Sequence, residues 1–190
     1  MDTLAYRIPE LSTLQVYEID LPETIEAKKA VLIRLFGEVP DHVRLVPVDF
    51  NRQELGKVLK EAGYSQESPS FFIWEGVTQY LLDAAVGQVF GFLQNASSGS
   101  HLLFTYIRKD FIDGQKMYDL EVLYRLMKCL KKEFWQFGMQ PGEVSDFLEA
   151  YGWQELEQVG STEYQQRYLQ PAGRIMPVME VERCVYAEKL

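Results

Sequence analysis

Carboxylates follow three apolar segments of the chain, each of which has the length and composition of a β-strand. Asp20, with Glu18 just before it, ends the first segment, Asp49 ends the second and Glu75 the third. In an open parallel sheet, ligands bind at the carboxyl ends of the strands. An acid there can accept hydrogen bonds from ribose hydroxyls, and Asp49 can accept from an adenine amine while the ring of Phe50 packs against the base. These residue types therefore indicate a nucleotide-like ligand.

The competing interpretation is that each acid only caps the following helix or lies in solvent. For any one of the acids taken alone, capping is the better interpretation, because short motifs have little specificity. Three acids at equivalent strand ends favour a binding site.

The strands that carry these acids alternate with helical patterns. We expect strands at residues 14–21, 43–50, 71–75, 101–107, 155–159 and 183–187, and helices at residues 22–36, 52–62, 83–96, 117–137, 141–151 and 162–169. This alternation predicts one α/β domain over residues 1–190, with a mainly parallel sheet and helices on both faces. The third strand is apolar throughout, which is typical of a parallel strand covered on both faces. The last two strands lack a long crossover between them, so we expect an antiparallel edge pair.

Composition excludes several classes of function. Asp and Glu total 28 against 19 Lys and Arg, and the net charge of -9 repels the phosphates of nucleic acids and anionic membranes. Two cysteines, Cys129 and Cys184, and two histidines, His42 and His101, make a disulfide framework or a zinc site improbable. His101 is a candidate general base, with a structural role as the favoured alternative. The N-terminus has no apolar signal sequence, and we expect a cytoplasmic protein.

Longer stretches carry a family resemblance. They read DTLAYRI (2–8), VYEIDLPETIEAKK (16–29), RLVPVDF (44–50), PSFFIWEGVTQYL (69–81) and SSGSHLLF (97–104), followed near the C-terminus by PGEVSDFLEAYGW and STEYQQRYLQP. Together they resemble the leucine carboxyl methyltransferase family, a group of class I S-adenosylmethionine-dependent methyltransferases. The resemblance implies a Rossmann-like methyltransferase fold with S-adenosylmethionine as cofactor.

The resemblance also implies roles for individual residues. Asp20 matches the acid that holds the ribose of S-adenosylmethionine, and Asp49 with Phe50 matches the pair around the adenine. Glu75 matches an acid close to the methionine part of the cofactor. Tyr80 matches a tyrosine beside the substrate pocket, which makes it the candidate catalytic residue. The alternative for Trp74 and Tyr80 is that both are core aromatic residues.

One part of the family pattern is missing. Family members carry a glycine-rich G-x-G loop just before the segment that matches Asp2 and Thr3, and the first glycine here is Gly37. Such a loop lets the backbone approach the cofactor closely. We therefore expect a fold that lacks the first strand, the glycine loop and the N-terminal helices. The strands on either side would then close up, receive a strand from another chain, or belong to a truncated product.

These features lead to two functions. The first is an S-adenosylmethionine-dependent methyltransferase, O- or carboxyl-directed, whose acceptor is a small molecule or a protein carboxylate and whose oligomeric state stays open. The second is a non-catalytic methyltransferase-like protein that binds no cofactor or needs a partner chain. A nicotinamide-dependent dehydrogenase is a weak third candidate, because it also requires the glycine loop and gives no role to Asp49, Phe50 and Glu75.

Overall fold

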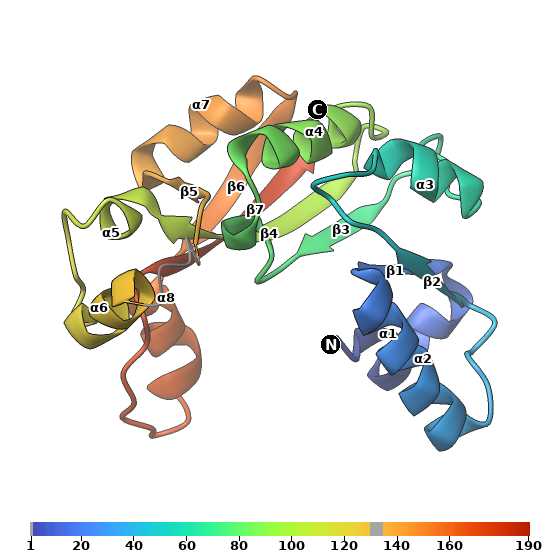
Figure 1. Ribbon diagram of the computed structural model, residues 1–190, viewed down its shortest axis with the longest axis horizontal. Helices are drawn as coiled ribbons and strands as arrows, with labels where there is room; N and C mark the ends of the chain where they lie inside the picture. Colours follow the sequence, from blue (N-terminus) through green and yellow to red (C-terminus); the bar gives the residue numbers. More distant parts are fainter. Residues whose placement is uncertain (1, 130–134) are drawn as a thin grey trace. The chain divides into compact units, whose positions relative to one another are not determined.

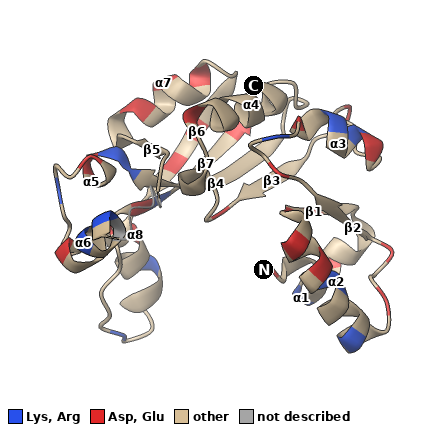
Figure 2. Cartoon of the chain, viewed as in Figure 1, with Lys and Arg blue, Asp and Glu red and all other residues tan. Residues whose placement is uncertain are grey.

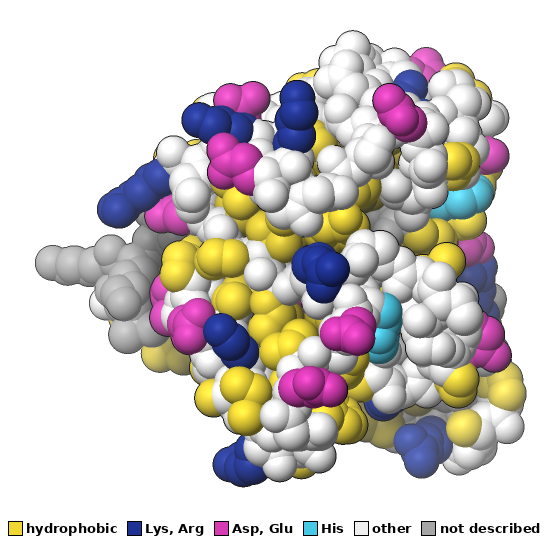
Figure 3. Space-filling view, turned by 90° about the vertical axis from the view of Figure 1, so that its right-hand side faces the viewer, with side chains coloured by type: hydrophobic (Ala, Val, Ile, Leu, Met, Phe, Trp, Pro, Cys, Tyr) yellow, Lys and Arg dark blue, Asp and Glu magenta, His cyan; other side chains and the backbone are white. Residues whose placement is uncertain are grey.

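A computed structural model of the chain describes residues 2–129 and 135–190 (Figure 1). The residues fall into two compact units, Met1–Ser65 and Gln66–Leu190. Basic residues are distributed over helices of both units (Figure 2). Hydrophobic side chains also reach the surface, where they are interspersed with charged ones (Figure 3). In the described part of the chain, no helix is long and apolar enough to cross a membrane, and Cys129 and Cys184 are free thiols.

The first unit is built on two parallel strands joined by a helix. Its elements are α1 (Leu4–Arg7), η1 (Pro9–Thr13), β1 (Val16–Asp20), α2 (Pro22–Phe36), β2 (Val43–Pro47) and α3 (Leu55–Glu61). Strands β1 and β2 pair in parallel from Val16 opposite Val43 to Asp20 opposite Pro47. This register brings the two carboxyl ends to the same edge of the sheet.

Helix α2 has the boundaries expected from the sequence, residues 22–36. Pro22 occupies its first turn, where proline's missing N–H costs no hydrogen bond. Gly37 ends the helix in the left-handed conformation with φ 86°, and its N–H donates to the Ile33 carbonyl oxygen at 2.9 Å. Only glycine adopts this conformation without steric cost. Ile25 and Leu32 bury the inner face.

The second unit contains a mixed five-stranded sheet. Its elements are β3 (Phe71–Trp74), η2 (Thr78–Tyr80), α4 (Asp83–Leu93), β4 (His101–Arg108), α5 (Lys109–Ile112), α6 (Glu121–Cys129), β5 (Gly138–Met139), η3 (Pro141–Glu143), α7 (Val144–Glu149), β6 (Trp153–Val159), α8 (Ser161–Tyr164), η4 (Gln165–Leu169) and β7 (Glu182–Lys189). The strand order is β3-β4-β7-β6, with β5 beside β4. Strands β3, β4 and β5 are parallel, whereas β7 is antiparallel to both β4 and β6. The expected α/β fold and the antiparallel pair near the C-terminus are confirmed.

Phe90 of α4 is the centre of the core on one face of this sheet. It is fully buried, and its ring centroid lies 5.6 Å from that of Phe104 on β4 and 4.8 Å from that of Phe147 on α7. Trp74 of β3 packs on the same ring at 5.8 Å. Edge-to-face pairs of this kind add to the free energy gained from burial. They fix α4 and α7 over the sheet.

The expectation that β3 is covered on both faces is wrong. Side chains alternate across a strand, so Phe72 and Trp74 face α4, where the Phe72 ring lies 6.3 Å from that of Phe92. Phe71 and Ile73 lie on the opposite face and are 57% and 50% exposed. An apolar strand sequence therefore does not by itself show that both faces are buried.

The helix expected over residues 117–137 is shorter in the structure. Helix α6 begins at Glu121, because Tyr118 and Asp119 have φ of 51° and 60°, which a right-handed helix excludes. Residues 135–137 are not helical, and 130–134 lie outside the described residues. Strand β5 and the short helices α1 and α5 were not expected from the sequence. Each has four residues or fewer and carries no periodic pattern.

Candidate functional site

Asp20 and Asp49 lie at the same edge of the β1–β2 sheet. Pairing of the strands continues one step past β2, because the Val48 N–H donates to the Asp20 carbonyl oxygen at 2.8 Å. Asp49 is the next residue. Both carboxylates are half-buried. The sequence-based expectation that these acids share one end of the sheet is therefore met by the backbone of the first unit.

The carboxylate of Asp49 also shapes the turn that follows β2. Its Oδ1 accepts the Asn51 N–H at 3.0 Å, its own N–H donates to Gln53 Oε1 at 2.9 Å, and Arg52 Nε lies 3.4 Å from its Oδ2. Asp20 Oδ1 accepts the Leu21 N–H at 2.7 Å. Neither acid caps the following helix, because the N-cap residues of α2 and α3 are Leu21 and Glu54. Each acid instead fixes the turn after its strand through one carboxylate oxygen.

Glu18 has a different environment from Asp20, although the sequence places the two acids together. It is buried at 8% exposure, and its Oε2 accepts from Lys28 Nζ at 2.6 Å and from the Tyr6 hydroxyl at 3.0 Å. Lys28 also donates to the Asp2 carbonyl oxygen at 2.8 Å. Burial first, and then the Glu18 carboxylate, raise the pKa of Tyr6. Glu18 therefore ties α1 and α2 to β1 through its Oε2.

Glu75 follows β3 and is exposed. The turn behind it is fixed by Thr105 of β4, whose Oγ1 accepts the Gly76 N–H at 2.8 Å and whose carbonyl oxygen accepts from the buried Thr78 hydroxyl at 2.6 Å. Gly76 has φ 67°, a conformation that glycine adopts freely. The sequence Glu-Gly-Val-Thr thus forms a turn that holds the Glu75 backbone at the carboxyl end of β3.

Tyr80 lies in the short helix η2 and is 44% exposed, so it is not a core aromatic residue. Its carbonyl oxygen accepts from Gln136 Nε2 at 3.3 Å, and the neighbouring Gln79 carbonyl oxygen accepts the Gln136 N–H at 2.7 Å. Trp74, in contrast, is buried against Phe90. Of these two aromatic residues, Trp74 is therefore part of the core and Tyr80 is not.

His101 makes contacts typical of a structural histidine. Its Nδ1 lies 3.0 Å from the Tyr186 hydroxyl, and the two rings stack with centroids 5.5 Å apart. It pairs with Phe71 at the start of β3, the opposite end of β3 from the turn at Glu75 and Gly76. The structure therefore supports a structural role for His101 rather than a role as a general base.

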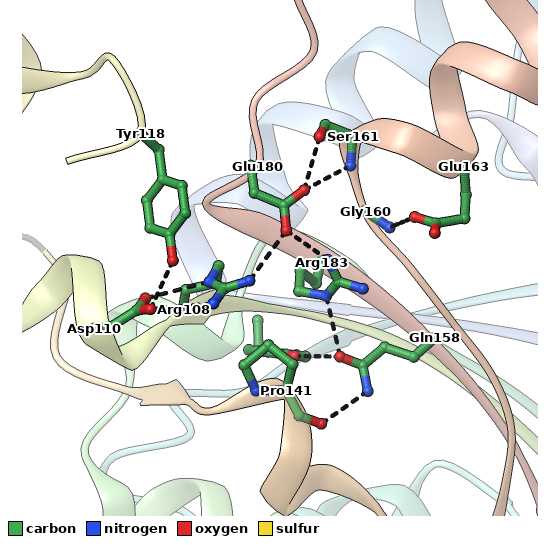
Figure 4. A network of polar contacts seen from close by, with 11 residues as sticks. Arg108, Asp110, Tyr118, Pro141, Gln158, Gly160, Ser161, Glu163, Glu180 and Arg183 are labelled. Carbon is green, nitrogen blue, oxygen red and sulfur yellow. Dashed lines mark hydrogen bonds and ion pairs between the residues drawn. The ribbon is translucent and has the colours of Figure 1, made fainter. Parts of the chain in front are cut away.

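A network of charged side chains that the sequence did not indicate lies at the carboxyl end of β4 (Figure 4). Arg108 donates through two nitrogens to Asp110, at 3.2 and 3.1 Å, and through Nη1 to Glu180 at 3.1 Å. The Tyr118 hydroxyl donates to Asp110 at 2.6 Å. Arg183 donates to Glu180 at 2.6 Å. Every charge in this network is therefore paired, which buried charges require.

The network joins segments that are far apart in the sequence. Glu180 also accepts from the backbone N–H and the hydroxyl of Ser161, at 3.0 and 2.8 Å. Arg183 Nε and the Tyr106 hydroxyl both donate to Gln158 Oε1, at 3.1 and 2.6 Å. Figure 4 shows these side chains converging between the β4 end, α8 and the segment before β7. The network positions the loop around Tyr118.

The pKa shifts of the network residues agree with a structural role. Burial would raise the pKa of Asp110, but hydrogen bonds from Arg108 and Tyr118 outweigh it and hold that pKa below its usual range. Burial and the bond to Asp110 raise the pKa of Tyr118 to about 12. For Glu180, burial is likewise outweighed by Ser161 and Arg183, and its pKa is lowered. None of these groups is poised to exchange a proton near neutral pH.

Comparison with known proteins gives a family match for the N-terminal part of the chain. Residues 1–94 match the family described as leucine carboxyl methyltransferase. The expected family is confirmed over this segment. All five candidate site residues, Asp20, Asp49, Phe50, Glu75 and Tyr80, lie within the segment that matches the leucine carboxyl methyltransferase family, whereas the charged network of Figure 4 lies beyond it.

Relatives of the chain extend the similarity. A protein of Mycolicibacterium smegmatis that carries the name of an S-adenosyl-L-methionine-dependent methyltransferase is 30% identical over 157 residues, which are 81% of this chain and 52% of that protein. One from Mycobacterium marinum with the same kind of name is 35% identical over 108 residues, covering 56% and 36%. The chain thus spans about half or less of the length of the curated relatives it matches.

Solved structures confirm the fold. A protein of Thermobifida fusca YX described as a methyltransferase has a TM-score of 0.63 at 13% identity, covering 92% of this chain and 63% of that chain. The magnesium protoporphyrin IX methyltransferase of Synechocystis PCC 6803, solved with bound S-adenosylhomocysteine, has a TM-score of 0.53 at 10% identity, covering 92% and 64%. At these identities the likeness shows the Rossmann-like methyltransferase fold.

Proposed function

We propose that the chain acts as an S-adenosylmethionine-dependent methyltransferase directed at an oxygen or carboxyl acceptor. The observation that carries this proposal is the parallel register of β1 and β2, which puts Asp20 and Asp49 at one edge of a sheet within the segment that matches the family. In this proposal residues 1–190 work as one domain in the cytoplasm. The acceptor is a small molecule or a protein carboxylate.

The nucleoside end of S-adenosylmethionine fits the residues of the first unit. Its ribose hydroxyls and adenine amine are donors, and carboxylates are acceptors only. Asp20 uses Oδ1 for the Leu21 N–H, which leaves Oδ2 for the ribose hydroxyls. Asp49 and the half-buried ring of Phe50 follow β2 and suit the adenine. The donor set therefore matches the group chemically.

The methionine end has less support in the chain. We assign Glu75 to the neighbourhood of the methionine part and Tyr80 to the acceptor pocket, both through the family pattern. The exposure of Tyr80 agrees with a role outside the core.

Little acid–base chemistry is required of the protein. When bound, the cofactor supplies a methyl group already activated by its positive sulfonium. The chain's own residues then bind the nucleoside, hold the acceptor in line with the methyl group and exclude water. An acceptor carboxylate is a competent nucleophile without a general base, and Tyr80 would contribute by orienting it.

The second candidate is a methyltransferase-like protein that binds no cofactor or does so only with a partner chain. The two candidates differ in what the isolated chain binds.

Calorimetric titration with S-adenosylhomocysteine tests the proposal. We expect saturable binding that weakens by about ten-fold or more in Asp20→Ala, because one such charged hydrogen bond contributes about 1.5–3 kcal/mol. Asp41→Ala is the matched control, since Asp41 is an exposed acid of the same unit. Absence of binding to folded protein would contradict the proposal and favour the second candidate. If binding is shown, the chain can be incubated with S-adenosylmethionine that carries a labelled methyl group. Release of the label from the product by mild alkali would identify a carboxyl acceptor.

A further inference from the structure

A cavity of about 290 Å³ lies in the second unit, between the sheet and the segment formed by α8 and η4. Its floor is formed by residues that are paired across β4, β7 and β6. Leu103 of β4 pairs with Tyr186 of β7, which in turn pairs with Glu157 of β6. Residues paired in this way project from the same face of a sheet. One step along, Cys184 of β7 and Val159 of β6 form the next row.

Aromatic rings form most of the remaining wall. Tyr164 of α8 and Tyr168 of η4 have centroids 6.0 Å apart, and Phe71 of β3 lies 6.2 Å from Tyr186. Tyr168 is 63% exposed and Phe71 is 57% exposed, so both present ring surface at the mouth of the cavity. The ring faces of tyrosine and phenylalanine attract cations.

The polar groups of the wall are already engaged. The Tyr186 hydroxyl bonds to His101, and the Tyr164 hydroxyl donates to the Cys184 sulfur. Arg167, a cation of the wall, is paired with Glu157 in a two-point contact. A ligand in this cavity would therefore be held by ring faces and aliphatic groups rather than by new hydrogen bonds.

Carboxylates give the cavity a negative surrounding. Glu157 and Glu163 line it. Burial first, and then the charges of Glu75, Glu182 and Glu157, raise the pKa of the Cys184 thiol. The thiol is therefore harder to ionise than that of a free cysteine, although a hydrogen bond from Tyr164 acts in the opposite direction. Arg167 and Glu157 neutralise each other, so the negative field that favours a positive ligand comes from Glu163 in the wall and from the nearby Glu75 and Glu182.

We propose that this cavity binds a small organic cation with an apolar body, such as an aryl or alkyl quaternary ammonium. Aromatic rings flanked by carboxylates are the recognised protein surface for such ions. The volume matches one substituted aromatic ring, at the lower end of the range for ligand pockets. The site consists of second-unit residues only and does not depend on the proposed methyl transfer.

Titration of the whole chain with benzyltrimethylammonium, followed by NMR chemical shifts, tests the site. Benzoate, which keeps the ring and reverses the charge, is the matched probe. We expect saturable binding of the cation and binding of benzoate at least about ten-fold weaker, because the carboxylates repel it. Equal binding of the two probes, or no saturable binding of the cation, would overturn the proposal.

Substitutions at Tyr168 locate the site. Tyr168→Ala should weaken binding of benzyltrimethylammonium by about five-fold or more, and Tyr168→Phe, which keeps the ring, should retain it. Tyr168 is exposed, so the fold should tolerate both changes, which circular dichroism checks. Leu126→Ala, on the exposed side of α6, is the control and should bind like the wild type. Unchanged affinity in Tyr168→Ala would show that the cation binds elsewhere.

Discussion

The backbone N–H of Val48 donates a hydrogen bond to the carbonyl oxygen of Asp20, with 2.8 Å between nitrogen and oxygen. Val48 is fully buried, so this bond is shielded from water. It extends the parallel pairing of β1 and β2 by one step and leaves Asp49 as the first residue outside it. The two candidate cofactor-binding acids are therefore placed by backbone pairing rather than by a flexible loop.

Asp49 should contribute to stability as well as to binding. Replacing it with Ala removes the acceptor for the Asn51 N–H, so we expect the free energy of unfolding to fall by about 1 kcal/mol. Asp49→Asn keeps an oxygen in the same position and should unfold like the wild type within about 0.5 kcal/mol. Urea unfolding measures both. Equal losses in the two variants would show that the charge, not the hydrogen bond, matters for the turn.

Lys28 neutralises the buried Glu18, and its removal should be costly. Lys28→Met leaves a carboxylate inside the first unit without its cation, and we expect a loss of about 3–5 kcal/mol in the free energy of unfolding. The double variant with Glu18→Leu should be more stable than Lys28→Met alone, because no unpaired charge then remains buried. Thermal unfolding of the single and double variants measures this coupling. Additive losses would contradict it.

Asp110 holds the loop around Tyr118 in place. Asp110→Asn removes one of the two carboxylates that pair with Arg108, and we expect a loss of about 1.5–3 kcal/mol because Glu180 remains as a partner. The matched control is Asp113→Asn, because Asp113 makes only an exposed ion pair with Lys109. That change should stay within about 0.5 kcal/mol of the wild type. Similar losses in both variants, measured by urea unfolding, would rule out a special role for the network.

The sequence predicts elements well where local signals are strong. The first turn of α2 is set by Pro22 and its end by Gly37, and both signals act within a few residues. The placement of Asp20 and Asp49 follows from strand ends that are equally local. These parts of the fold and of the candidate site were therefore predictable.

Other features depend on contacts between distant segments. Arg108 and Glu180 lie 72 residues apart, and nothing in either local sequence indicates the pair. The exposure of Phe71 and Ile73 likewise depends on which helices cover the sheet, since an apolar strand reads the same whether one face or both are buried. A charged residue at the end of an apolar strand, such as Arg108 at the end of β4, is the one signal that points to such a network.

Acid should destabilise the second unit through Asp110 and Glu180. Both carboxyls have a pKa below the usual value in the folded state, because hydrogen bonds and cations outweigh their burial. Near pH 4 the unfolded chain therefore binds more protons than the folded chain, so stability rises with pH through this range. The stabilisation from these two carboxylates is complete at pH values above about 4, the pKa of such groups in the unfolded chain. It is lost as the pH falls through their lower pKa values in the folded chain. Urea unfolding at several pH values between neutral and acid should show this decline, and Asp110→Asn should show a shallower one. A variant with the same pH dependence as the wild type would mean that other carboxylates cause the loss.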